Sequence, residues 1–190
     1  MLYAEKKMND SKSYLKNYGQ LFIAIELCLK NKLQIPTLSL IYNGIDTFSW
    51  LAYGDIGVKE RYTRWIKEWM YKNRKLSADP VDLYAARCSI LHTLTPYSKL
   101  SDEKKAKIIC YSWGDADVEK LKAAIEKIRP GEASSVHIDE LYELFKEGVI
   151  KFTNALESDK ELAKQVDERL AKHYSHLDKS IIDEVYKKCV

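Results

Sequence analysis

Two side chains whose chemistry suits a phosphate ester, Arg87 and His92, lie five residues apart in the sequence. An imidazole titrates near neutral pH, so a histidine can take up or release a proton during a reaction. A guanidinium keeps its charge and presents a planar fork of N–H donors that matches the oxygens of a phosphate. The pair therefore suits proton transfer beside a bound phosphate, provided that the fold brings both side chains to the ligand.

The element that carries both residues is predicted to be one helix, which begins at Asp79 and is ended by Pro96. Asp79 is a suitable N-cap, and Pro80 fits the first helical position, where a missing N–H costs nothing. On a helical wheel Arg87 lies roughly 40° from Leu83, inside the apolar stripe of this helix. Because an unpaired buried charge is costly, Arg87 must find an acid, a carbonyl group or a ligand.

Two amphipathic helices precede this element, one over residues 11–31 and one that starts at Pro36. The second places a small residue, Gly44, and a carboxylate, Asp46, inside an otherwise apolar helix. A glycine there costs up to about 1 kcal/mol relative to alanine, and close helix packing is a plausible reason for it. Asp46 is a candidate partner for Arg87.

A third helix, over residues 58–73, belongs to a strongly basic part of the chain. Between residues 59 and 75 seven basic side chains stand against two acidic ones, a local charge of +5. These cations can follow phosphates while an exposed aromatic ring stacks on a base. In the alternative interpretation, Trp65 and Trp69 belong to the core and the charges form the solvated face. The residues that we assign to substrate binding are Arg61, Arg64, Lys67 and Asp46.

The rest of the chain predicts a short sheet and several helices. A β-branched and aromatic run over residues 107–113 indicates a strand, and residues 134–138 are suited to pair with it. We therefore expect a mainly α fold, a helical bundle with a small two-stranded β element and C-terminal helices. Residues 1–114 would form the bundle core and residues 115–190 a helical extension, with a soft boundary near Gly114. The helices of that extension are expected from Asp115 to about Ile128, from Asp139 to about Phe152, and twice after about Asp159.

The segment Arg87-Cys88-Ser89-Ile90-Leu91-His92 resembles the Arg-x4-His signature of the HEPN superfamily of helical proteins, many of which are metal-independent endoribonucleases. The resemblance covers roughly residues 11–96 and implies an up-and-down core of four helices with the motif on the last. It also implies a homodimer in which the motifs of two protomers face each other across a cleft that holds RNA. In that case Arg87 would stabilise the phosphate, and His92 would act as general base or acid while the 2′-hydroxyl attacks.

Two alternatives to catalysis stay open at this point. In the first, Arg87 forms a structural salt bridge with Asp46 or another buried carboxylate, and His92 is a helix-end histidine bonded to a carbonyl group. The protein is then a noncatalytic interaction or ligand-binding module. In the second, a cavity lined by tryptophans binds a small molecule, although we expect Trp50 and Trp113 in the core. A buried Arg87–Asp46 pair within one chain would favour the first alternative.

Composition restricts the function only broadly. The chain has 190 residues, 46% of them hydrophobic, and a formal net charge of +3, which permits a nucleic-acid partner without requiring one. The four cysteines form no CxxC pair, and Cys88 and His92, which share a helix face, would need two more ligands to hold zinc. We therefore expect no metal, no cofactor and no membrane partner. Reduced thiols and an N-terminus that turns charged at Glu5, without a signal peptide, predict a cytoplasmic protein.

Overall fold

The computed structural model describes residues 18–170 and 186–187. It confirms a mainly α fold with one small two-stranded sheet. Apart from a helix over residues 18–30, the elements are α2 (Gln34–Tyr53), α3 (Val58–Trp65), the π-helical turn η1 (Ile66–Met70), α4 (Pro80–Thr93), α5 (Lys99–Asp102), β1 (Ile108–Ser112), α6 (Val118–Ile128), β2 (Ala133–His137), α7 (Ile138–Ser158) and α8 (Lys160–Leu170).

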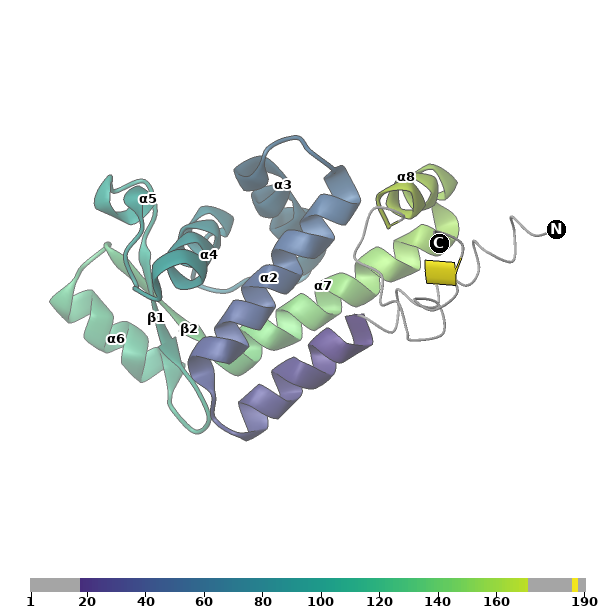
Figure 1. Ribbon diagram of the computed structural model, residues 1–190. Helices are drawn as coiled ribbons and strands as arrows, with labels where there is room; N and C mark the ends of the chain where they lie inside the picture. The colour runs from purple at the N-terminus through teal and green to yellow at the C-terminus, as the bar shows by residue number, and fades with distance from the viewer. Residues whose placement is uncertain (1–17, 171–185, 188–190) are drawn as a thin grey trace.

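Three long helices form the centre of the molecule. Figure 1 shows the helix over residues 18–30, α2 and α7 side by side, with β1, β2 and α6 at one end and α8 at the other. A Cβ atom on Gly44 of α2 would lie 2.5 Å from Cζ of Phe145 on α7 and 3.1 Å from Leu21 on the first helix. Close packing of three helices is therefore the reason for this glycine, as the sequence interpretation proposed.

The core between these helices is mainly aromatic and aliphatic. Phe48 of α2 contacts both Phe145 and Phe152 of α7 edge-on, with ring centroids 6.0 and 6.2 Å apart. Trp65 at the end of α3 is fully buried against the same cluster, 6.1 Å from Phe145. The α3 helix thus places its aromatic face in the core, and α7 completes a core that the first half of the chain begins.

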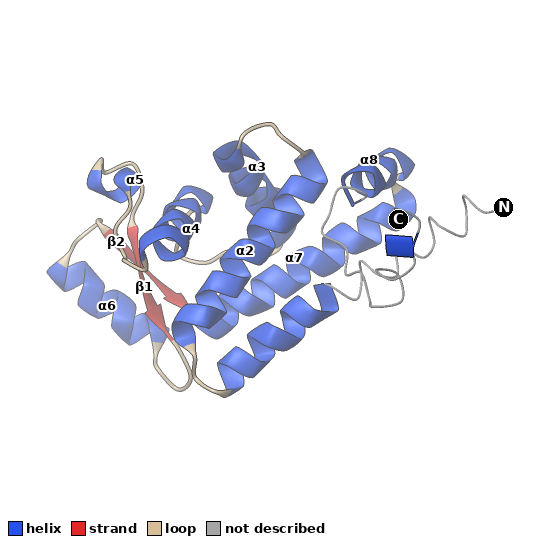
Figure 2. Ribbon diagram, in the orientation of Figure 1, coloured by secondary structure: helices blue, strands red, loops and turns tan. Residues whose placement is uncertain are grey.

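The two strands pair in parallel, with Ile108 opposite Ala133 and Ser112 opposite His137. Parallel neighbours need a crossover connection, and α6 supplies it (Figure 2). One strand precedes Gly114 and the other follows it, so the sheet joins the two predicted parts of the chain. The division at Gly114 itself stays a prediction.

The motif-bearing helix α4 is held firmly at its N-terminus. Asp79 and Asp82 form a reciprocal capping box, in which the backbone N–H of Asp79 donates to Asp82 Oδ2 at 2.9 Å. The second oxygen of Asp82 accepts the N–H of Lys107 at 2.7 Å, just before β1. At the other end the helix stops at Thr93, because Leu94 adopts a left-handed conformation with φ of 53°. The predicted start is confirmed, and the end comes three residues before Pro96.

Several predicted details differ from the structure. The third helix changes to a π-helical turn after Trp65, with the N–H of Tyr71 donating to the carbonyl of Ile66 at 2.8 Å. His137, not Asp139, is the N-cap of α7, and its Nδ1 accepts the N–H of Asp139. The prediction that Trp113 is a core residue is wrong, because 43% of it is exposed.

Other predictions lie partly outside the described residues. The first helix is described only from residue 18, and the second charged C-terminal helix falls in a part that the structure does not describe. The first of the two, α8, is confirmed, and its Val166 packs into the core. Among the described helices, none combines the length and the apolarity that crossing a bilayer requires.

Candidate functional site

One carboxylate holds two arginines at the junction of α2, α3 and α4. Asp46 Oδ1 accepts Nη2 of Arg61 at 3.1 Å, and Asp46 Oδ2 accepts Nη2 of Arg87. The three side chains are 14–16% exposed, so the cluster is largely shielded from solvent. The predicted partnership of Asp46 with Arg87 is confirmed. The sequence did not predict that Arg61 shares the same carboxylate.

The cluster keeps a net charge of +1, since two guanidiniums face one carboxylate. Burial lowers the pKa of Arg87, but the charge of Asp46 and its hydrogen bond outweigh that effect and raise the pKa above its ordinary value. Arg87 is therefore cationic at every relevant pH. The cluster presents positive charge that its own carboxylate does not neutralise.

Three buried polar atoms at or beside this cluster have no hydrogen-bond partner among the described residues. They are Nε of Arg61, Nε of Arg87 and the hydroxyl of Tyr62. Tyr62 is fully buried, and its pKa is raised by burial and by the neighbouring charges of Tyr42 and Asp46. Buried donors are usually satisfied by a protein group, a water or a ligand. These unpaired atoms lie beside the two guanidiniums and are shielded from solvent.

His92 lies apart from the Asp46 cluster. Residues five apart are separated by roughly 140° around a helix, and α4 turns Arg87 inward while His92 is exposed. The imidazole makes no hydrogen bond or ion pair with any residue that the structure describes, so the carbonyl contact expected for a structural histidine is not found there. A ligand can therefore reach His92 only from outside α4.

The other two predicted substrate-binding residues do not join the Asp46 cluster. Arg64 donates from Nε to Glu68 at 2.8 Å and lies over the ring of Tyr53, 4.4 Å from its centroid. Lys67 is exposed, and its side chain makes no hydrogen bond or ion pair with the residues that the structure describes. Of the basic side chains assigned to substrate binding, only Arg61 therefore meets Arg87.

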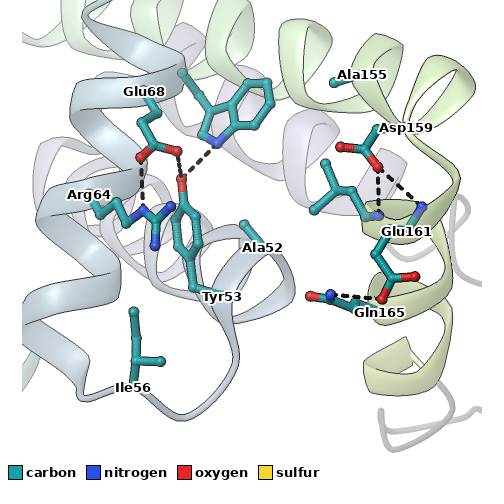
Figure 3. Close-up of a pocket in the computed structure, with 11 residues that line it drawn as sticks. Ala52, Tyr53, Ile56, Arg64, Glu68, Ala155, Asp159, Glu161 and Gln165 are labelled. Atoms are coloured by element: carbon teal, nitrogen blue, oxygen red, sulfur yellow. Dashed lines mark hydrogen bonds and ion pairs between the residues drawn. The ribbon is translucent and has the colours of Figure 1, made fainter.

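The alternative of a cavity lined by several tryptophans finds no match in the two cavities of the described residues, because each has one tryptophan in its lining. One, of about 430 Å³, lies between α2, α3, η1, α7 and α8 and is lined by Trp69 (Figure 3). The other, of about 330 Å³, adjoins the ends of β1 and β2 and is lined by Trp113. Neither of the two is lined by Arg87 or His92. Cavities depend on which elements meet in three dimensions, and no local sequence signal marks them.

The described residues hold no group of three or more histidine, cysteine, aspartate or glutamate side chains that could hold a metal ion. Cys28, Cys88 and Cys110 are free and half-buried. Burial raises the pKa of the Cys110 thiol, which keeps it protonated. Comparison with known proteins adds nothing to this geometry: no family model matches the chain, and no curated protein or solved structure is significantly similar to it.

Proposed function

We propose that the protein acts on RNA as a HEPN-like homodimer in the cytoplasm, binding the RNA backbone and cleaving it without a metal ion. The helical core would be the up-and-down bundle of four helices that the resemblance implies. One observation supports the proposal above all others. Arg61 and Arg87 are held together by Asp46 with a net positive charge and unused N–H donors, on a helix that also carries an exposed histidine.

In this proposal each residue has a separate task. Arg87 and Arg61 bind a phosphate of the RNA and stabilise the charge that develops on it, while Asp46 keeps both guanidiniums in place. His92 takes the proton of the 2′-hydroxyl, whose oxygen attacks the adjacent phosphorus. The P–O5′ bond breaks, the leaving oxygen gains a proton, and the products carry a 2′,3′-cyclic phosphate and a 5′-hydroxyl.

The proposal requires a dimer because the side chains of the two motif residues, Arg87 and His92, point in different directions. Within one chain, Arg87 faces Asp46 and His92 faces solvent. Two copies whose α4 helices face each other would bring His92 of one copy near the arginines of the other. Sedimentation equilibrium tests this element of the proposal directly, because a protein that stays monomeric at assay concentration cannot form such a site.

The test of the activity is cleavage of a mixed RNA pool in excess chelator. His92→Ala changes an exposed side chain and is expected to fold normally, yet to lose cleavage. Arg87→Ala is expected to lose cleavage and some stability, whereas Lys99→Ala, at an 88% exposed side chain, is the matched control. An inert wild type, or a His92→Ala variant that cleaves like the wild type, would refute the nuclease proposal.

A second function, a noncatalytic interaction or ligand-binding module, is favoured by a different observation. Arg87 already has a counter-ion in its own chain, and His92 lines neither of the two cavities. On this hypothesis the Arg87–Asp46 pair serves stability alone. An inert wild type combined with an Arg87→Ala variant that unfolds readily would favour it over the nuclease.

A further inference from the structure

The larger cavity has two chemically different walls (Figure 3). On one wall Tyr53 donates its hydroxyl hydrogen to Glu68 at 2.6 Å and accepts the indole N–H of Trp69 at 3.0 Å. Arg64 completes this wall by stacking on Tyr53. The result is an ordered surface of π-systems, fixed by hydrogen bonds before any ligand arrives.

The opposite wall is formed by α8 and by Asp159, the residue before it, and carries oxygen acceptors. Asp159 Oδ1 accepts the N–H groups of Glu161 and Leu162, at 3.1 and 2.9 Å. Glu161 Oε1 accepts the amide of Gln165 at 3.1 Å. The second oxygen of Asp159 and that of Glu161 make no hydrogen bond to the described part of the chain. They are acceptors that the described residues leave free at the edge of the cavity.

The cavity lies along the same face of the fold as the Asp46 cluster. Tyr53 follows Asp46 by seven residues on α2, which places it within about 20° of the same helix face and about 10 Å further along the axis. Arg64 follows Arg61 by three residues on α3, again on one face. A ligand only a few nucleotides long can therefore reach both places.

We propose that this cavity binds one base of the RNA strand whose phosphate lies at Arg87, and that guanine is the base it prefers. This subsite rests on the proposed action on RNA. Unpaired bases are recognised in RNA-binding proteins by stacking on aromatic rings and on guanidinium planes. The exposed face of the stacked Arg64, the ring of Trp69 and a volume of about 430 Å³ fit such a base.

The charge of the cavity decides which part of a nucleotide enters it. Glu68, Asp159 and Glu161 against Arg64 give the lining a net charge of −2, which repels a phosphate. The same carboxylates attract the N–H donors on the edge of a base. Guanine offers two adjacent donors, N1–H and the N2 amino group, to the free oxygens of Asp159 and Glu161, whereas uracil offers one.

Calorimetric titration of the full-length protein with guanosine and uridine tests the subsite, because nucleosides carry no phosphate. Wild type is expected to bind guanosine about tenfold more tightly than uridine. Ala155→Phe fills the cavity from α7 and should weaken guanosine binding by about tenfold or more. Asn154→Phe adds the same ring at an exposed neighbour that does not line the cavity, and should leave binding unchanged.

A second variant tests the subsite even if Ala155→Phe does not fold. Glu161→Gln keeps the size of an exposed side chain and removes one acceptor charge, so guanosine affinity should fall about fivefold while uridine affinity stays the same. Equal binding of both nucleosides by wild type, or undiminished guanosine binding by both cavity variants, would overturn the subsite.

Two further binding measurements distinguish failure of the subsite from failure of the proposed function. An oligouridine with one internal guanosine should bind more tightly than oligouridine, and Ala155→Phe should abolish that preference. If guanosine monophosphate binds as tightly as the oligonucleotide, the cavity serves a free nucleotide and the RNA assignment is overturned. Guanosine binding without any RNA cleavage or Arg87-dependent RNA affinity would refute the proposed function and leave a base-binding cavity.

Discussion

Removing the carboxylate of Asp46 is expected to destabilise the protein strongly. Asp46→Ala leaves Arg61 and Arg87 close together, 14–16% exposed, with no counter-ion between them. Removing one partner of a buried ion pair costs about 3–5 kcal/mol. Because these side chains keep some exposure to solvent, we expect a loss at the lower end of this range, about 3 kcal/mol of unfolding free energy. For a chain of 190 residues this corresponds to a fall in Tm of about 6–12 °C.

Urea denaturation followed by circular dichroism measures this loss directly. Asp102→Ala, which removes an exposed carboxylate that has no ion pair with the described residues, is the matched control and should change the free energy by less than about 0.5 kcal/mol. Asp46→Asn keeps an acceptor and should lose less than Asp46→Ala. If Asp46→Ala lowers the free energy by less than about 1 kcal/mol, the idea that this carboxylate holds the two arginines in place is wrong.

Three further outcomes follow from the core. Gly44→Ala should destabilise by about 1–3 kcal/mol in urea denaturation, because its Cβ would lie 2.5 Å from the ring of Phe145; a neutral effect would show that the helices separate easily. Tyr42→Phe should lower the free energy of unfolding by about 1–3 kcal/mol, because it leaves the hydroxyl of Tyr111 without its partner. Changing both Tyr42 and Tyr111 to phenylalanine should lower it less, and equal losses in the single and double variants would contradict this reasoning. Burial raises the pKa of Tyr42 and of Tyr62 in the folded state, so stability should be full below about pH 10 and fall above it as the unfolded chain ionises. Absorbance at 295 nm should then show these tyrosines ionising only with unfolding, and their titration in the folded protein near pH 10 would refute their burial.

Local signals in the sequence predicted much of the motif helix and its main contact. The proline and aspartate at its start define the N-terminus of α4, and the apolar stripe places Arg87 where it must find an acid. Because Asp46 was an isolated carboxylate in an apolar helix, the pairing followed from the cost of burying either charge alone. The role of Gly44 could also be predicted, because a glycine inside a helix is costly and close helix packing explains it.

Features that depend on tertiary geometry were not predicted. The parallel direction of β1 and β2 depends on where α6 crosses, and the strand sequences alone carry no signal for it. Trp113 is a large aromatic residue of the kind that usually lies in a core. It follows the last residue of β1, where it is partly exposed and lines a cavity instead. The sharing of Asp46 by Arg61 and Arg87 requires three helices to meet at one point.

The measurement that tests the central claim most directly is single-turnover cleavage of a labelled RNA by the wild type and by His92→Gln, in chelator and with analysis of the product ends. The account predicts that the wild type leaves 2′,3′-cyclic phosphate and 5′-hydroxyl ends, and that His92→Gln folds and binds RNA normally but cleaves at least about 100-fold more slowly. Equal cleavage rates, or cleavage that stops when metal is removed, would contradict it.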